Sequence, residues 1–458
     1  MKNIETGSVK ESKVLGIARR ARSAARQLST LSDVMRREVL LVIADALVER
    51  QAEILAANAQ DAEAALSAVE EGKMTRAMFH RLQTSEIGVA EMRARVRDVA
   101  SLPDPLGRIL EATELDDDLT LHKVSCPLGV IGIVFESRPD VIPQVAALAL
   151  KSGNAVIFKG GSEAAHTNQV LAETWRDALG RFPEIPQDAV SLLHTREDVA
   201  QLLCLDQEID LIIPRGSREF VRYIAENSRI PVLGHGEGVC HVYIDQAADL
   251  EKGHAVAFDS KVQYPAACNA METLLVHESI ADVFLPEMIA QFFNAGVEVR
   301  GCQRTMSLAN GNQQVRGSLR LGNGNLIVSA TEQDWATEYS DLIVSIKIVS
   351  SADEAIEHIQ RYGSGHTESI VTEDSDLAER FMETVDAAGV FHNVSTRFAD
   401  GFRYGLGAEL GISASKLHAR GPVGLEGLTT YKYKLFGNGH TVAMYSKGER
   451  SFKHRKLI

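Results

Sequence analysis

One cysteine, Cys268, stands in a run of small residues directly before an apolar segment, in "VQYPAACNAMETLLVH" (262–277). A thiolate is a strong nucleophile, but its activation needs a turn, a helix N-terminus or a neighbouring cation. The surrounding alanines leave steric room for such a role, and Asn269 and Glu272 are polar neighbours. On spacing alone, a single cysteine is more often a buried filler than a catalytic group, so both interpretations stay open here.

Two later segments place polar side chains next to predicted strands, where functional residues commonly lie. In "YGSGHTESI" (362–370), His366 stands between glycines and a strand. In "FHNVSTRFADGFRYG" (391–405), four polar residues follow a strand: Asn393, Ser395, Thr396 and Arg397. An arginine can bind a carboxylate or a phosphate through two hydrogen bonds. For the second segment, an ordinary surface loop is an equal alternative.

The usual dinucleotide fingerprint, GxGxxG after a strand, is absent. Two strand-to-helix turns offer other places for a phosphate. Lys159 ends a strand in "IFKGGSEA", and Gly216 and Ser217 follow a strand in "IIPRGSREF". Both turns present backbone N–H groups and a helix dipole to a ligand. Each turn alone is equally consistent with a plain connection; two of them on adjacent strand ends favour a nucleotide site.

Composition excludes several functional classes. The formal net charge of −14 and the pI near 5.5 argue against nucleic-acid binding, which needs a basic surface. No apolar run is long enough for a membrane span. Five scattered cysteines, with neither CxxC nor HExxH, indicate no disulfide framework and no zinc site.

The N-terminal segment lacks the apolar region of a secretory signal. Its arginines resemble those of a transit peptide, but Glu5 and Glu11 and the continuing helical pattern argue against that alternative. We therefore expect a cytoplasmic protein, where sparse, unpaired cysteines are usual.

The elements that must position these residues belong to the α/β class. Residues 8–100 have helical spacing, and "RILEATELDDDLTLHKVSC" (108–126) alternates as an exposed hairpin does. From Pro127, and again from about residue 252, apolar strands alternate with helices, which predicts two doubly wound parallel sheets. The C-terminal stretch from 424 alternates again and predicts an edge hairpin or arm that pairs with another strand.

Six segments together resemble the γ-glutamyl phosphate reductases of the aldehyde dehydrogenase superfamily. They are "GVIGIVFESRPDV", "AVIFKGGSEA", "GVCHVYID", "YPAACNAMETLLVH", "YGSGHTESIVTED" and "LGISASKLHARGPVGLEGLTTYK". The similarity runs in order over essentially the whole chain. It implies an aldehyde-dehydrogenase-like fold with a Rossmann-like NADP(H)-binding domain (1–107 and 127–251) and an α/β catalytic domain (252–423). A small β oligomerisation element (108–126 and 424–458) would pair between subunits of a homo-oligomer.

The resemblance also implies roles for individual residues. Cys268 matches the nucleophile, and Lys159 matches the lysine at the adenosine ribose and its phosphate. Ser162 stands where NAD-preferring relatives often have a glutamate, which favours NADPH. Gly216 and Ser217 match the turn that faces the pyrophosphate. Glu338, in "TEYSDLIVSIKIV", matches the glutamate that holds the nicotinamide ribose.

Two departures from the hydrolytic aldehyde dehydrogenases concern the chemistry. His235 takes the place of the glutamate that activates water there, so hydrolysis of a thioester is disfavoured. Ser137, in "FESRPD", takes the place of the asparagine that binds the oxyanion, and the backbone N–H of Cys268 remains as a donor.

The implied reaction is the reduction of L-glutamate 5-phosphate to L-glutamate 5-semialdehyde in proline biosynthesis, through a thioester on Cys268. We expect the substrate's carboxylate, ammonium and phosphate to be held by these residues: Ser137, Arg138, His366, Asn393, Ser395, Thr396 and Arg397. A transient contact with a glutamate 5-kinase is a further expectation, since acyl phosphates are short-lived. The alternatives are a hydrolytic or CoA-acylating aldehyde dehydrogenase and a catalytically silent member of the fold.

Overall fold

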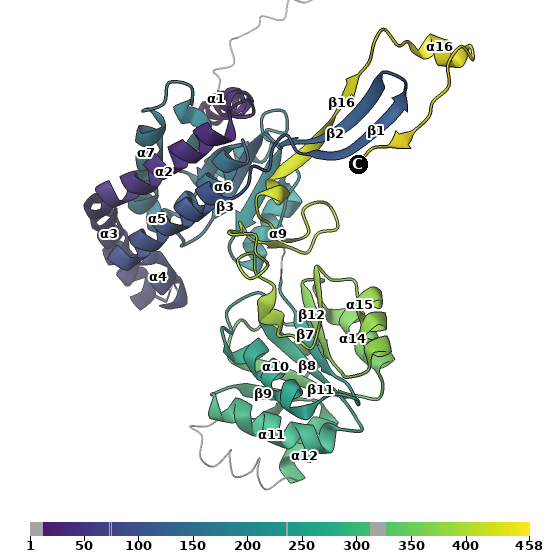
Figure 1. Ribbon diagram of the computed structural model, residues 1–458. Coiled ribbons are helices and arrows are strands. Elements are labelled where there is room, and N and C mark those ends of the chain that lie inside the picture. The colour runs from purple at the N-terminus through teal and green to yellow at the C-terminus, as the bar shows by residue number, and fades with distance from the viewer. Residues whose placement is uncertain (1–11, 73, 75, 235–236, 312–326) are drawn as a thin grey trace, which may run out of the picture. The chain divides into compact units, whose positions relative to one another are not determined.

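The computed structural model describes residues 12–72, 74, 76–234, 237–311 and 327–458. They form two units of α/β structure (Figure 1). Unit 1 comprises the described residues up to Gly234 together with 406–410 and 423–458; unit 2 comprises those from Glu237 to Gly405 and 411–422. The sequence predicted a boundary after residue 251. Strand β7 (Cys240–Ile244) instead hydrogen-bonds to strands of unit 2, which places the residues before 251 in that unit's sheet.

The sheet of unit 1 is parallel, with the strand order β5-β4-β3-β6. Its strands are β3 (Val130–Phe135), β4 (Ala155–Lys159), β5 (Val190–Leu193) and β6 (Leu211–Arg215). Every residue of β3 and β4 is buried, as a central strand covered on both faces requires. The "PVLG" segment, which the sequence predicts as a strand, makes only an isolated bridge from Val232 to Ile212.

Helices cover this sheet in layers. Helix α1 contacts β3, β4 and β5, α6 contacts β4, and α7 contacts β5. Helices α2, α3 and α5 then pack on α6 and α7, so the described residues between 12 and 100 form helical layers, as their helical spacing predicts. The helices of unit 1 are α1 (Lys13–Leu28), α2 (Asp33–Glu49), α3 (Gln51–Glu70), α4 (Arg76–Leu82), α5 (Glu86–Ser101), α6 (Val141–Lys151), α7 (Ala165–Leu179), α8 (Arg196–Leu202) and α9 (Arg218–Asn227), with short 3-10 turns at η1 (Ser162–Ala164) and η2 (Gln187–Ala189).

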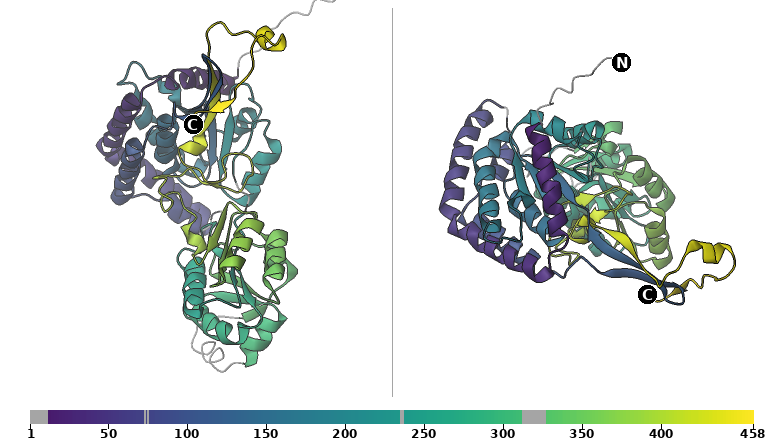
Figure 2. Two further views of the ribbon diagram at one scale, coloured as in Figure 1. Left: turned by 45° about the vertical axis from the view of Figure 1, so that its right-hand side comes forward. Right: turned by 90° about the horizontal axis from the view of Figure 1, so that it is seen from above.

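The predicted hairpin and C-terminal arm form one antiparallel sheet, with the order β16-β2-β1-β17. Its strands are β1 (Ile109–Asp116), β2 (Leu119–Pro127), β16 (Thr429–Phe436) and β17 (Arg455–Lys456). The two segments therefore pair with each other inside one chain, since β16 supplies the partner that β2 lacks (Figures 1 and 2). After β16 the chain continues through α16 (Val442–Ser446), not through a second long strand.

Unit 2 is built on a seven-stranded parallel sheet, with the order β10-β9-β11-β8-β7-β12-β13. The strands that follow β7 are β8 (Met271–His277), β9 (Glu298–Gly301), β10 (Ile327–Ser329), β11 (Ile343–Val349), β12 (Thr367–Val371) and β13 (Gly389–His392). All seven residues of β8 are buried, including the polar Glu272 and Thr273. The α/β class with parallel sheets is confirmed in both units.

The remaining elements of unit 2 connect these strands. They are α10 (Leu250–Val262), α11 (Ala281–Asn294), α12 (Gln303–Gly311), η3 (Glu332–Ala336), α14 (Ala352–Tyr362), α15 (Ser375–Thr384), η4 (Thr396–Phe398) and the strand pair β14 (Ile412–Ser413) and β15 (Gly421–Pro422), while η5 (Glu426–Leu428) precedes β16 in unit 1. No helix in the described parts of the chain combines the length and the apolar character needed to cross a membrane.

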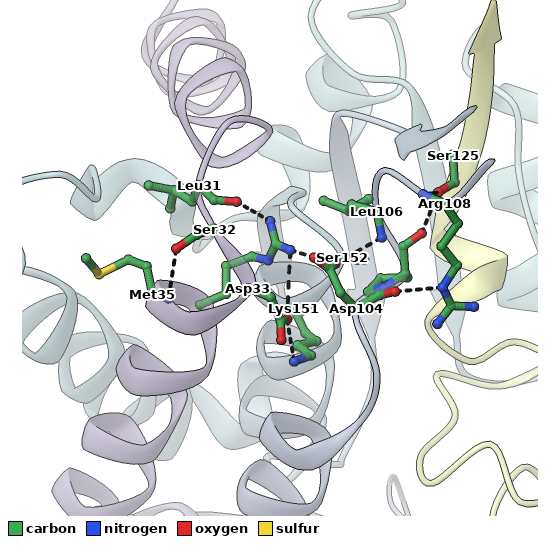
Figure 3. Close-up of polar contacts among 12 residues, drawn as sticks. Leu31, Ser32, Asp33, Met35, Asp104, Leu106, Arg108, Ser125, Lys151 and Ser152 are labelled. Carbon is green, nitrogen blue, oxygen red and sulfur yellow. Dashed lines mark hydrogen bonds and ion pairs between the residues drawn. The ribbon is translucent and has the colours of Figure 1, made fainter. Parts of the chain in front are cut away.

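A buried polar network joins the helical layers of unit 1 to the base of the hairpin (Figure 3). Lys151, at the end of α6, donates to Asp33 Oδ1 at 2.6 Å and to the carbonyl oxygen of Ala100 at 3.3 Å. Arg36 donates to Asp104 Oδ1 at 2.6 Å. Both cations are fully buried, so their carboxylate partners compensate a large desolvation cost.

The network continues from Asp104 to the hairpin. The backbone carbonyl of Asp104 accepts a hydrogen bond from Arg108 Nε at 2.7 Å. The backbone N–H of Arg108 then donates to Ser125 Oγ at 3.0 Å, across the base of the hairpin (Figure 3). The orientation of the hairpin at its base is therefore fixed by hydrogen bonds and not only by apolar packing.

Replacing Asp33 by alanine tests this network. The change leaves Lys151 buried without its carboxylate partner, and we expect the free energy of unfolding to fall by about 3–5 kcal/mol. The midpoint of urea denaturation, followed by circular dichroism, measures the effect. Asp45→Ala is the matched control on the same helix, because its pairs with Arg93 and Arg97 are exposed and worth at most about 1 kcal/mol. Equal midpoints for the two variants would contradict the account.

Candidate active site

Cys268 lies in a turn between α10 and β8, in unit 2. The turn is closed by two backbone hydrogen bonds, from Ala267 to Tyr264 at 3.2 Å and from Ala270 to Ala267 at 2.9 Å. Cys268 is only partly buried, so its thiol has access to a ligand.

The backbone of Gly238, just before β7, packs directly against the backbone of Cys268. A Cβ atom at Gly238 would lie 2.8 Å from the Cα atom and 2.6 Å from the carbonyl carbon of Cys268, both inside van der Waals contact. No side chain fits there, since the obstacle is backbone and cannot rotate away. Gly238 therefore permits the position of the cysteine turn.

The His-Thr-Glu loop, residues 362–370 with His366, Thr367 and Glu368, leads into β12 and approaches the Cys268 turn. Cys240 Sγ donates to the carbonyl oxygen of Cys268 at 3.4 Å. The same sulfur lies 3.8 Å from His366 Nδ1. His366 Nδ1 also lies 2.9 Å from the hydroxyl of Thr367. Burial raises the pKa of Cys240 well above its ordinary value, so this thiol is a neutral donor. His366 is completely buried and contacts the cysteine turn through Cys240.

The buried Glu368 fixes this loop to β7. Its carboxylate accepts a hydrogen bond from the backbone N–H of His241 at 2.7 Å and lies 2.9 Å from His241 Nδ1. The loop, β7 and the Cys268 turn meet at the amino ends of β12, β7 and β8. In open parallel sheets ligands more commonly bind at the carboxyl ends, so this arrangement departs from the general rule.

A second segment, residues 395–399, forms hydrogen bonds on both sides of the Cys268 turn: to α10 before it and to Asn269 after it. Ser260 on α10 bonds to Ser395 Oγ at 3.2 Å and to the backbone N–H of Thr396 at 3.2 Å. Asn269 Nδ2 donates to the carbonyl oxygen of Ala399 at 2.7 Å. The predicted residues Ser395 and Thr396 thus lie against the helix that leads into Cys268.

Arg397 brings a positive charge to Cys268. Its Nε donates to Gln263 Oε1 at 2.9 Å, and its guanidinium lies over the ring of Tyr264. Burial lowers the pKa of Arg397 and Arg403 lowers it further, whereas the Cys268 thiol raises it. The cation and a thiolate at Cys268 therefore stabilise each other. A neighbouring cation is one of the three means by which a protein activates a thiol, besides a turn and a helix N-terminus.

A buried ion pair supports β8 directly after the cysteine turn. Lys261 donates to Glu272 Oε2 at 2.7 Å, and Glu272 Oε1 accepts from the backbone N–H of Ser340 at 3.2 Å. Burial raises the pKa of Glu272 to about 7, and the charge of Glu338 raises it too. The predicted cofactor residue Glu338 therefore lies within electrostatic range of the residues that support Cys268.

The side chain of Asn393 forms hydrogen bonds with the backbone of Thr372. Its side-chain amide accepts from the backbone N–H of Thr372 at 3.0 Å and donates to the Thr372 carbonyl oxygen at 3.1 Å. Its backbone adopts φ +56°, a left-handed conformation that asparagine tolerates. The structure gives this residue a role in closing the end of β12, and its predicted contact with substrate stays a prediction.

The predicted nucleotide residues of unit 1 gather at the carboxyl ends of its strands. Lys159 ends β4 and lies almost fully buried, with Ser162 exposed three residues later. Burial lowers the pKa of Lys159, and nearby Glu163 raises it. Gly216 and Ser217 follow β6, and Ser217 N donates to Glu136 Oε2 at 3.0 Å. The start of α9 thus already holds an anionic oxygen.

The prediction that the Lys159 and Gly216 turns lie on adjacent strand ends is wrong, because β3 lies between β4 and β6. The loop after β3 carries Ser137 and Arg138, so it separates the two turns. Ser137 has φ +43° and donates its N–H and its hydroxyl to Glu163 Oε1, at 2.6 Å and 2.8 Å. The side chain of Glu163, which follows β4, therefore holds Ser137 in its strained backbone conformation.

The structure adds residues that the sequence reasoning did not select. Four of them position predicted site residues: Gly238, Cys240, Gln263 and Glu163. Apart from Gly238, none has a residue type or spacing that suggests this role, which arises only from contacts in the folded chain. Gly238 is the one with a signal, since a glycine directly before a buried strand marks close backbone approach. His235, predicted to replace the glutamate base, lies outside the described residues.

Comparisons with known proteins identify the family to which the chain belongs. The model of the aldehyde dehydrogenase family matches residues 4–300, which include Cys268. A protein from Haloquadratum walsbyi named gamma-glutamyl phosphate reductase is 54% identical over 438 residues, 95% of this chain and 94% of its own. The chain belongs to the aldehyde dehydrogenase family and, within it, to the γ-glutamyl phosphate reductases.

Other relatives support the same assignment. A protein of the same name from a Synechococcus species is 52% identical over 98% of this chain and 95% of its own. The crystal structure of gamma-glutamyl phosphate reductase from Thermotoga maritima superposes with a TM-score of 0.88 at 40% identity, covering 94% of this chain and all of that one. An acetylating aldehyde dehydrogenase from Geobacillus thermoglucosidasius, at 18% identity and a TM-score of 0.64 over 94% of this chain and 97% of its own, shares the fold.

Gly238→Ala is the most direct test of how Cys268 is positioned. The added methyl group must displace the Cys268 backbone, and a displacement of about 1 Å is enough to lower activity roughly a hundredfold. Steady-state turnover and the rate of Cys268 alkylation by iodoacetamide measure the effect. Gly311→Ala, where a Cβ meets nothing within 4 Å, is the matched control. Full activity in Gly238→Ala would contradict the packing described.

Arg397→Gln tests the electrostatic support of Cys268. Without the cation the thiolate loses its stabilising charge, and we expect alkylation at neutral pH to slow by about tenfold or more. Arg380→Gln, which removes an exposed arginine of the same unit that pairs with Asp353, is the control and should leave the rate unchanged. An unchanged rate in Arg397→Gln would show that another group activates the thiol.

Proposed function

We propose that this chain reduces L-glutamate 5-phosphate to L-glutamate 5-semialdehyde, with release of phosphate and with NADPH as the reductant, in proline biosynthesis. The observation that carries the proposal is the turn in which Cys268 packs against the backbone of Gly238 and stays partly exposed, in a chain that matches the γ-glutamyl phosphate reductases over nearly its full length. The charge of Arg397 acts on this cysteine, and a thiolate that a cation stabilises is suited to attack an electrophilic carbonyl carbon.

The Cys268 thiolate attacks the acyl carbon of the substrate, the carbon–oxygen bond to phosphate breaks, and a γ-glutamyl thioester forms on Sγ. The nicotinamide cofactor, when bound, supplies the hydride that reduces this thioester. The resulting thiohemiacetal expels the Cys268 thiolate and releases the aldehyde. The charge of Arg397 stabilises the Cys268 thiolate that leaves carbon in this last step.

The residues for the cofactor fit an anionic dinucleotide. Ser217 N–H holds a carboxylate oxygen at the start of α9, so this turn can present the same donor to a pyrophosphate. A Cβ at Gly216 would lie 2.9 Å from the carboxyl carbon of Glu136, so the glycine lets this carboxylate approach the turn closely. Glu338 is proposed to hold the nicotinamide ribose.

Our preference for NADPH over NADH rests on charge at the end of β4. Burial lowers the pKa of Lys159 and the charge of Arg196 lowers it further, whereas Glu163, Glu136 and Asp198 raise it. The carboxylate of Glu163 accepts two hydrogen bonds from Ser137. Ser162 adds no negative charge, and a 2′-phosphate is therefore favoured.

Three further parts of the proposal concern partners and place. The exposed apolar side chains of β16, which include Tyr431, Tyr433 and Phe436, favour an oligomerisation role for the arm in a homo-oligomer. A transient contact with a glutamate 5-kinase would protect the acyl phosphate from water. We place the enzyme in the cytoplasm, in keeping with its free cysteines.

The reverse reaction distinguishes this function from hydrolytic aldehyde oxidation. Glutamate 5-semialdehyde and NADP⁺ should give NADPH only when inorganic phosphate is present, because phosphate must take the acyl group from Cys268. Cys268→Ala should lower the rate to background, whereas Cys204→Ala, at an exposed cysteine of unit 1, should leave it unchanged. Equal turnover with and without phosphate would contradict the proposal, and so would an active Cys268→Ala variant.

A further inference from the structure

The buried ion pair of Lys261 and Glu272 closes the segment of unit 2 that contains the Cys268 turn. Lys261 lies near the end of α10, seven residues before Cys268, and Glu272 is the second residue of β8, four residues after it. Lys261 Nζ donates to Glu272 Oε2 at 2.7 Å, and both side chains are completely buried. An apolar pair of similar volume is often as stable as a buried ion pair, so stability alone does not explain these charges.

The other carboxylate oxygen of Glu272 binds a different segment of unit 2. Glu272 Oε1 accepts a hydrogen bond from the backbone N–H of Ser340 at 3.2 Å. Ser340 precedes β11, which pairs directly with β8. Its φ of +51° is a left-handed conformation, which costs energy in a residue other than glycine and persists only where the surroundings hold it. The hydrogen bond to Glu272 is one such restraint.

Ser340 follows Glu338 by two residues, and the residue between them is anchored as well. The hydroxyl of Tyr339 lies 2.9 Å from Asp334 Oδ1 and 2.7 Å from Ser345 Oγ. The chain directly after Glu338 is therefore held at two consecutive residues. The Glu338 carboxylate itself makes no hydrogen bond or ion pair with another described residue, which leaves it available to a ligand.

We propose that Glu272 is a positioning residue, which holds the backbone of the Glu338 segment at a fixed place relative to the Cys268 turn. The inference rests on the proposed function and deepens it, because Glu338 is the residue proposed to hold the nicotinamide ribose. One oxygen of Glu272 is bound to the segment that carries the nucleophile, and the other is bound to the segment that carries the ribose ligand. Glu272 thus relates two functional groups of the site without contacting substrate or cofactor.

Two double variants test this role. Lys261→Met/Glu272→Leu, the apolar variant, replaces the ion pair by apolar side chains and leaves the Ser340 N–H without its acceptor. Lys261→Met/Glu272→Gln, the amide variant, keeps a side-chain oxygen for that N–H and is the matched control. The apolar variant should lower kcat of the phosphate-dependent reverse reaction and weaken NADPH binding, each by about tenfold or more, because misplaced reacting groups are costly. The amide variant should stay close to the wild type.

Further measurements separate positioning from general damage to the fold. Isothermal titration calorimetry with 2′,5′-ADP, which has no nicotinamide ribose, should give the wild-type affinity in the apolar variant. Alkylation of Cys268 by iodoacetamide should also keep its wild-type rate. Glu338→Gln should reproduce the losses of the apolar variant, and the two changes together should cause no further loss, because both act through one contact. Glu278→Gln, which removes an exposed partner of Arg304 beyond the other end of β8, should change none of these quantities.

Hydrogen exchange on the wild-type enzyme tests the central contact without any substitution. The N–H of Ser340 should exchange slowly although this residue is exposed, and fast exchange would overturn the inference. The inference is also overturned if the apolar variant loses affinity for 2′,5′-ADP as much as for NADPH, or if its losses add in full to those of Glu338→Gln. A wild-type enzyme with neither NADPH binding nor phosphate-dependent turnover would instead refute the proposed function itself.

Discussion

The contact between the backbones of Gly238 and Cys268 is the constraint on which the proposed chemistry depends. It exists because β7 and β8 pair side by side, so the segments that precede them meet at one end of the sheet. Two buried polar contacts stabilise this end of the sheet. Glu368 links β12 to β7, and the Lys261–Glu272 ion pair links α10 to the start of β8. Glu368 lies against His241 and Glu272 against Lys261, and these partners offset the cost of burying the charges.

Unit 1 supplies a different kind of site. There the carboxyl ends of three parallel strands present backbone N–H groups, a buried lysine and a strained serine, and carboxylates of the protein already occupy the donors at Ser137 and Ser217. The same donors suit an anionic cofactor. In the proposed function, unit 2 supplies the nucleophile and unit 1 supplies the residues for the cofactor.

Much of the fold could be predicted from the sequence because apolar strands alternate with helices; β3, for example, is a continuous apolar run that is buried throughout. The order of strands could not, since no local pattern places β3 between β4 and β6 or pairs β16 with β2. Cys268 was selected by its residue type and then by resemblance. Gly238, Gln263 and Glu163 escaped selection because their roles arise from contacts between segments far apart in the sequence.

The central claim is that Cys268 carries the γ-glutamyl group. Mass spectrometry of the enzyme after incubation with glutamate 5-semialdehyde and NADP⁺ in the absence of phosphate tests it most directly. The account predicts the added mass of one γ-glutamyl group on the peptide that contains Cys268, and its loss when phosphate is added. An adduct on another residue, or catalytic turnover with no adduct on Cys268, would contradict it.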